Sequence, residues 1–111
     1  MAKYEKSMTG QFEVVIDRLN KDIMNSGTSM NLVDESNYAI GDTNIAVRVY
    51  DKYFMRNGNR ASLSLTVVGH GNEIFVSAIG AGGGQGILLN FSLGAESNMV
   101  KIVEASINRM E

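Results

Sequence analysis

The chain contains no cysteine, and this absence sets the first limits on its chemistry. Disulfide bonds and cysteine-ligated zinc sites are excluded, because both need thiol groups. His70 is the only histidine, so a multi-histidine metal centre is excluded as well. The acidic residues are scattered without the spacing of a calcium-binding loop. We therefore expect neither a metal ion nor a cofactor.

Long apolar runs and an excess of positive charge are also missing. No stretch approaches the ~18 consecutive apolar residues of a membrane span, and the charged first residues do not resemble a secretory signal. We therefore expect a cytoplasmic protein without a membrane partner. Ten basic and twelve acidic residues give a net charge of −2. Because proteins that neutralise phosphates are usually basic, this balance disfavours a nucleic-acid partner.

Proline is absent, so the turns that end helices and strands must be formed mainly by the twelve glycines. This combination favours tight hairpins between regular strands over a fold dominated by loops. A length of 111 residues is common for one domain, and a hydrophobic content of 44% supplies a core. We expect a single α+β domain spanning residues 1–111.

Apolar residues recur at helical spacing near both ends of the chain. The first pattern predicts a helix over about 10–25, and the second predicts a helix over about 95–109. The predicted inner stripes are Phe12, Val15, Ile16, Leu19 and Ile23 in the first helix, and Met99, Ile102, Val103, Ser106 and Met110 in the second.

Between the helices the apolar pattern changes to a period of two, which is typical of strands. The predicted strands are residues 28–34, 44–55, 60–69, 73–80 and 87–93, with an irregular connection over 34–42. The expected fold is thus an N-terminal helix, a largely antiparallel meander sheet of about five strands, and a C-terminal helix. Both helices should cover the one strongly apolar sheet face.

The pairing of strands 44–55 and 60–69 decides which side chains face the helices. A three-residue loop over 56–58, with Gly58 left-handed in a bulge, makes the apolar faces agree by placing Val49 opposite Leu65. Asp51 then falls on the inner face. A two-residue turn at 70–71 or 71–72 follows, and it places Ile74, Val76 and Ala78 on the core face.

The same register predicts an outer face that is unusually apolar for a surface in contact with water. The leading hypothesis is therefore a non-enzymatic binding or assembly module that forms a homodimer through this face. No catalytic residue is identified. The predicted interface residues are Tyr50, Phe54, Val68, Phe75 and Ile79.

Two alternatives remain open. In the first, backbone N–H groups of the glycine-rich segment 80–86 hold an anion or nucleotide, in a small-ligand binding protein or weak enzyme. No Lys-Ser or Lys-Thr pair closes this segment, so a P-loop is excluded. In the second, basic and aromatic residues on the outer face, among them Lys52, bind single-stranded RNA. The candidate ligand-binding residues are Gly82, Gly84, Gln85, His70 and Arg48.

Four segments together carry a resemblance to a known family. They are residues 1–7 (MAKYEKS), 46–53 (AVRVYDKY), 58–63 (GNRASL) and 74–80 (IFVSAIG). In these segments the chain resembles an uncharacterised family of small bacterial proteins, described only as a domain of unknown function. The resemblance implies a bacterial cytoplasmic protein, and it implies no activity and no site residues.

Overall fold

The computed structural model describes residues 2–27, 29–54, 58–82 and 89–111, with the side chains of residues 54, 59 and 89–96 outside that description. The described elements are β1 (Ala2–Thr9), α1 (Phe12–Met24), β2 (Met30–Ile40), β3 (Thr43–Phe54), β4 (Asn59–His70), β5 (Glu73–Gly82) and α2 (Leu89–Met110).

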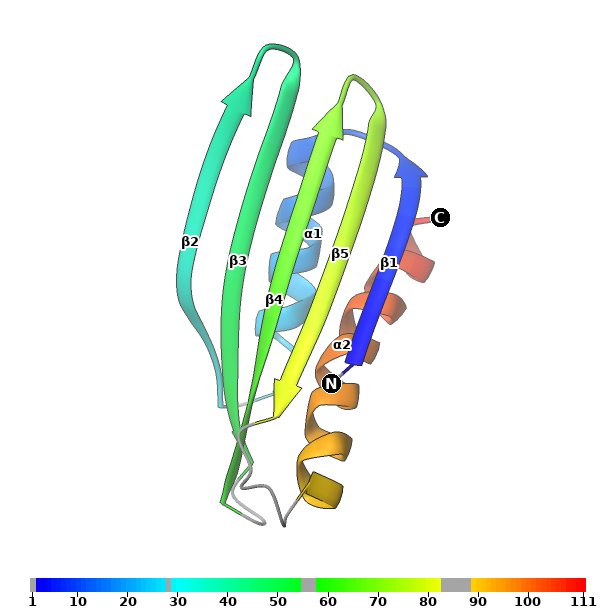
Figure 1. The fold of residues 1–111 in the computed structure, drawn as a ribbon. Helices are drawn as coiled ribbons and strands as arrows, with labels where there is room; N and C mark the ends of the chain where they lie inside the picture. Colours follow the sequence, from blue (N-terminus) through cyan, green and yellow to red (C-terminus); the bar gives the residue numbers. More distant parts are fainter. Residues whose placement is uncertain (1, 28, 55–57, 83–88) are drawn as a thin grey trace.

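The strands form one five-stranded antiparallel sheet in the order β1-β5-β4-β3-β2. Both helices lie behind the sheet in Figure 1, so the face toward the reader has no helix over it. The helix α2 contacts β1, β4 and β5, whereas α1 contacts α2, β2 and β4. The predicted α+β class, with both helices on one face, is confirmed.

The core lies between the helices and the inner face of the sheet. The predicted stripe of α1 is confirmed, since Val15, Ile16, Leu19 and Ile23 are buried and Phe12 packs against them. Burial of such side chains supplies about 1.5–3 kcal/mol each, so these stripes hold both helices on the sheet. The predicted stripe of α2 is confirmed only in part: Met99, Val103 and Ser106 are buried, and Ile102 and Met110 are partly buried. Val100 and Ile107 are buried as well, although the prediction left them out.

Two strand assignments at the chain ends differ from the prediction. Residues 2–9 form β1, which pairs with β5 and alternates between partly buried and exposed side chains. The predicted strand 87–93 is wrong, because Leu89 begins α2, while residues 87–88 lie outside the described residues. A short apolar run fits a strand and a helix equally well. The place beside β5 is taken by β1, so a strand at 89–93 has no neighbour to pair with there.

The predicted irregular connection over 34–42 is also wrong. The strand β2 continues to Ile40, and the register shifts between Leu32 and Asp34, where Val33 is the additional residue. A β-bulge of this kind moves every later side chain to the other face, so the period of two breaks at one position. The turn to β3 then needs only Gly41 and Asp42, with Gly41 at a φ of 55°.

The predicted register between β3 and β4 is wrong by one residue. Tyr50 pairs with Leu63 and Ala46 with Val67, and Gly58 has the expected positive φ of 70°. This slip inverts the faces of β3, so Ala46 and Tyr50 are fully buried. Tyr50 is accommodated inside because its hydroxyl donates a hydrogen bond to Asn20 Oδ1 at 2.7 Å.

The prediction for β4 and β5 is confirmed. Gly71 and Asn72 form the two-residue turn, and Gly71 has a φ of 60°. This turn pairs Val67 with Val76. The side chains of Ile74, Val76 and Ala78 are buried as expected.

Candidate functional site

The sheet register arranges the outer face in rows that cross the strands. One row contains only large apolar side chains, and we call it the apolar row. Tyr38 on β2 pairs with Ile45 on β3, Ile45 pairs with Val68 on β4, and Val68 pairs with Phe75 on β5. Tyr38 is 62% exposed and Phe75 is 38% exposed. Since both helices lie behind the sheet (Figure 1), nothing in the described chain covers this row.

The middle of this face carries no charged side chain, although 20% of the chain is charged. Loss of charge at the centre of a surface is a compositional signal of protein–protein interfaces. We call this region the central outer face. It consists of Ile45, Val47 and Val49 on β3, Ser62, Ser64, Thr66 and Val68 on β4, and Phe75, Ser77 and Ile79 on β5.

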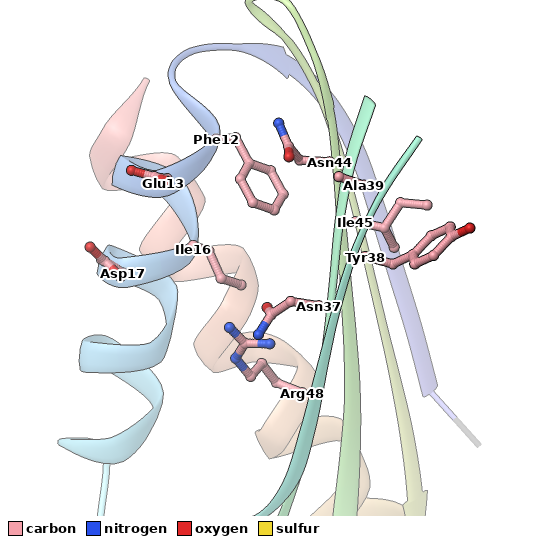
Figure 2. A pocket seen from close by; sticks show the side chains of 10 residues that line it. All are labelled: Phe12, Glu13, Ile16, Asp17, Asn37, Tyr38, Ala39, Asn44, Ile45 and Arg48. Carbon is pink, nitrogen blue, oxygen red and sulfur yellow. The ribbon is translucent and has the colours of Figure 1, made fainter. Parts of the chain in front are cut away.

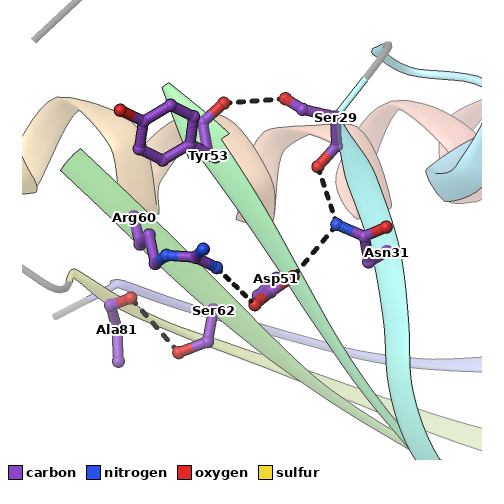
Figure 3. Close-up of polar contacts among 7 residues, drawn as sticks. All are labelled: Ser29, Asn31, Asp51, Tyr53, Arg60, Ser62 and Ala81. Carbon is purple, nitrogen blue, oxygen red and sulfur yellow. Dashed lines mark hydrogen bonds and ion pairs between the residues drawn. The ribbon is translucent and has the colours of Figure 1, made fainter. Parts of the chain in front are cut away.

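Polar contacts close one end of the outer face, as Figure 3 shows. Arg60 Nη1 lies 3.1 Å from Asp51 Oδ2, and Asn31 Nδ2 donates to Asp51 Oδ1 at 3.4 Å. Ser29 Oγ donates to the Tyr53 carbonyl oxygen at 2.7 Å. The predicted inner position of Asp51 is therefore wrong, because the shifted register turns it outward. There it meets a cation and keeps contact with water.

A shallow depression of about 500 Å³ lies at the opposite end of this face. We call it the β1–β5 depression. Val68 and Phe75 give it an apolar floor, and His70 and Glu73 lie at its polar side. His70 Nδ1 shares a hydrogen bond with Thr43 Oγ1 across the strands at 3.2 Å. The remaining lining residues are Ser7, Met8, Thr9 and Ile74.

A second hollow, of about 550 Å³, lies on the inner side between α1 and the β2–β3 hairpin. We call it the α1 pocket. In Figure 2, Arg48 and Asn37 point from the sheet toward α1, whereas Tyr38 and Ile45 point to the other side. The α1 pocket and the apolar row therefore use opposite faces of the same hairpin. Phe12 and Ile16 supply the apolar wall on α1.

Arg48 is held firmly in the α1 pocket, with only 12% of its side chain exposed. Its Nε lies 3.0 Å from Glu35 Oε1. Its Nη1 donates to the carbonyl oxygens of Val47 at 3.0 Å and Ser36 at 3.3 Å. Among the contacts of the described residues, Nη2 has no acceptor. This nitrogen is thus the donor that remains for a polar molecule.

The structure does not bring the five predicted ligand-binding residues together. Arg48 lies on the inner face, and His70 lies on the outer face. Gly82 pairs with Ala61 at the other end of β4 from His70, roughly 30 Å away at about 3.3 Å per residue. Gly84 and Gln85 lie outside the described residues.

Of the five predicted interface residues, the structure places three on the outer face. Val68, Phe75 and Ile79 lie on the outer face as expected. The outward placement of Tyr50 is wrong, because its side chain is fully buried. The side chain of Phe54 lies outside the described residues. The RNA-binding surface predicted on the outer face is not formed by these residues either, because the register places Arg48, Tyr50 and Lys52 on the inner face.

Sequence reasoning missed the apolar residues that β2 adds to the outer face. Tyr38 and Ile40 are 62% and 60% exposed, and they lie on the segment that was expected to be irregular. The available signal was the alternation of Ser36, Tyr38 and Ile40 with Asn37 and Ala39. This pattern covers too few residues to be distinguished from a loop when a bulge precedes it.

The two helices are joined by a carboxylate that belongs to neither hollow. Ser106 Oγ donates to Asp22 Oδ2 at 2.6 Å, and the side chains of Arg109 and Arg18 reach the same oxygen at 3.1 and 3.2 Å. The hydrogen bond from Ser106, helped by the two arginines, holds the pKa of Asp22 below its usual range despite desolvation by burial. We interpret this cluster as a structural contact that holds α1 and α2 together.

Burial also acts on Tyr50, whose pKa is raised to about 12 by desolvation. Within the described residues, no group of three or more histidine, aspartate or glutamate side chains could hold a metal ion. No helix in the described parts of the chain is both long enough and apolar enough to span a lipid bilayer.

The chain was compared with known proteins at three levels. No curated protein matches it. Among solved structures, it is similar to TTHA0849 from Thermus thermophilus, with 10% sequence identity and a TM-score of 0.32 over 99% of this chain and 98% of that chain. Neither value is high enough to bear on function. The family described as "Family of unknown function (DUF6054)" matches residues 1–111, so the chain belongs to this family.

Proposed function

We propose that this protein is a bacterial, cytoplasmic, non-enzymatic assembly module that forms a homodimer through its central outer face. The observation that carries the proposal is the apolar row, on a face with an uncharged centre that neither helix covers. Contiguous exposed apolar side chains of this kind mark interaction sites more often than plain surface. A second copy is the partner that is present whenever the protein is present.

The size of the whole outer face, which surrounds the central outer face with β1 and β2, supports a dimer. Five strands about 4.8 Å apart, with roughly ten residues each at about 3.3 Å per residue, span roughly 800 Å². This is close to the area that each partner buries in a standard interface. Two such sheets pack face to face at about 10 Å, with side chains interdigitating between them.

Edge-to-edge pairing is the competing way to join two sheets, and the free edge of β2 is unsuited to it. The bulge at Val33 disrupts the edge, and the adjacent acidic residues Asp34 and Glu35 would face like charges in a symmetric pairing. Bulges and charges are the features by which natural sheets avoid edge association. Pairing of two β2 edges is therefore disfavoured.

The test is the molar mass in solution, measured by size-exclusion chromatography with light scattering at tens of micromolar. We expect a dimer for the wild type and a monomer for Phe75→Glu, because the new charge would be buried without a partner. The matched control is Val14→Glu on α1, where Val14 is 57% exposed, and it should remain dimeric. A monomeric wild-type protein would contradict the proposal.

The α1 pocket supports a second candidate function, the binding of a small polar molecule. The specific observation is Arg48, which is largely buried and keeps Nη2 for a ligand beside an apolar wall. Native mass spectrometry of freshly purified protein tests this candidate. A mass excess on each chain that disappears in Asn37→Phe, which fills the pocket, would support it. A clean mass for the wild type would argue against it.

A further inference from the structure

We propose that the two copies are related by a two-fold axis parallel to β4, so that Tyr38 of each copy enters the β1–β5 depression of the other. This inference rests on the proposed homodimer and specifies its geometry. It begins from the strand order, in which β4 is the middle strand with two strands on each side. A two-fold axis along the middle strand exchanges β3 with β5 and β2 with β1, since symmetric dimers use one patch twice.

The first consequence is that apolar residues meet apolar residues. Ile45 and Phe75 lie in one row on the two sides of Val68, so Ile45 comes to face Phe75 of the partner subunit. Val49 and Ile79 flank Ser64 in another row, so Val49 comes to face Ile79 of the partner subunit. The side chains of β4 face their own counterparts, and those of Ser62, Ser64 and Thr66 are small enough for close approach.

The second consequence is that opposite charges meet at the rim. Asp34 on β2 and Lys3 on β1 end the row that runs through Val49, Ser64 and Ile79. The axis therefore places Asp34 opposite Lys3 of the partner subunit, and it does so twice per dimer. Both residues are exposed, and neither forms a salt bridge within the described part of the chain.

The third consequence concerns shape. Tyr38 is the most exposed of the large hydrophobic residues described, and it ends the apolar row on the β2 side. At the other end of that row, Phe75 pairs with Ser7 on β1, and Ser7 lines the β1–β5 depression. Each Tyr38 ring thus lies over Ser7 of the partner subunit, at the edge of the depression and beside Phe75 of the partner subunit. Because Ser7 lies on an edge strand, the Tyr38 hydroxyl keeps access to water there, which a tyrosine with a covered ring needs.

The competing arrangement has a two-fold axis that is also parallel to the plane of the sheet but perpendicular to β4. It turns the face end over end, so the apolar row would lie over rows that contain Asp34 or Asp51. Apolar groups and carboxylates would then be desolvated together, at a cost that the parallel axis avoids. The parallel axis is therefore the arrangement that the residue pattern favours.

A charge exchange tests this geometry. Asp34→Lys and Lys3→Glu should each weaken the homodimer about tenfold or more, because each brings two pairs of like charges together. An equimolar mixture should form a heterodimer of wild-type affinity. In that heterodimer the introduced lysine meets the introduced glutamate, and the native Lys3 and Asp34 meet across the other side. Native mass spectrometry separates the species by mass, and Glu104→Lys on α2 is the control that should not change dimerisation.

The shape argument has its own test. Tyr38→Ala should raise the dimer Kd about tenfold or more, since aromatic side chains seated in hollows of the partner contribute strongly to interface energetics. Tyr53→Ala is the matched control, because Tyr53 is 40% exposed on the same face at the end far from the depression. It should change the Kd by less than about threefold.

The outcomes separate the two proposals. A wild-type protein that stays monomeric overturns the homodimer and this geometry together. A wild-type dimer that Phe75→Glu dissociates, combined with no preference for the mixed heterodimer, overturns only the axis parallel to β4. Equal effects of Tyr38→Ala and Tyr53→Ala overturn the seating of Tyr38 in the depression.

Discussion

At the scale of single residues, Asp22 on α1 connects the two helices through its carboxylate. Its Oδ2 receives the Ser106 hydroxyl at 2.6 Å and contacts Arg109 on α2 at 3.1 Å. The pKa of Asp22 is lower in the folded protein than in the unfolded chain, mainly because of Ser106. Such a group stabilises the fold above its unfolded pKa of about 3.9, and this contribution is lost as the pH falls through the lower folded pKa.

We therefore predict that Asp22→Asn lowers the free energy of unfolding by about 1–2 kcal/mol at neutral pH. The difference from the wild type should shrink as the pH falls below about 4, because Asp22 is protonated there in the unfolded chain first and in the folded protein only at lower pH. Urea denaturation at the two pH values measures both effects. The control is Asp17→Asn on the exposed side of α1, which should change little. A stability difference that is equal at both pH values would refute the electrostatic part of the argument.

At the scale of elements, the position of α1 depends on a close contact between its first residue and β4. A Cβ atom added at Gly69 would lie 2.8 Å from Phe12 Cδ1 and 2.9 Å from Phe12 Cβ. These atoms cannot move away without moving the first turn of the helix. We expect Gly69→Ala to destabilise the protein by about 1–3 kcal/mol, the usual cost of overpacking a core.

The matched control for this prediction is Gly27→Ala. The added Cβ atom there would meet only the far end of Lys52, with Nζ at 2.6 Å. Because that end is flexible, the substitution should cost much less than Gly69→Ala. Thermal denaturation of both variants measures the difference. Equal melting temperatures would mean that α1 does not depend on the contact with Gly69.

The elements also differ in how far the sequence predicted them. The stripe of α1 and the centre of the α2 stripe were predictable because helical spacing is local. The β4–β5 hairpin was predictable because its turn needs only Gly71 and Asn72. The faces of β3 were not, because a change of one residue in the preceding register moves Tyr50 from the surface to the core. In the observed register the buried Tyr50 hydroxyl donates to Asn20, a partner from a distant part of the chain that no local pattern reveals.

At the scale of the whole molecule, a dimer that is more stable than its separate chains should melt at a temperature that depends on concentration. Mass action favours the folded dimer as the concentration rises. For a chain of this length we expect the melting temperature of the wild type to rise by roughly 5 °C over a hundredfold increase in concentration. Differential scanning calorimetry measures this shift.

Phe75→Glu provides the comparison for this measurement. Its melting temperature should not change with concentration, because a monomer unfolds without a change in the number of particles. A wild-type melting temperature that is equally independent of concentration would contradict an interface that contributes to stability.

The sequence by itself determined the α+β class, the inner stripe of α1, the centre of the α2 stripe and the core faces of β4 and β5, because each depends on a periodic pattern within one segment. The candidate site was predicted only in part. Val68, Phe75 and Ile79 were placed correctly, whereas Tyr38 and Ile45 were missed and Tyr50 was wrongly included. Only the tertiary structure decided that β1 pairs with β5, that β2 continues past its bulge and that Tyr50 lies inside. The strand pairings depend on which strands compete for the same neighbour, and the burial of Tyr50 depends on a hydrogen-bond partner for its hydroxyl. A local sequence pattern contains neither kind of information.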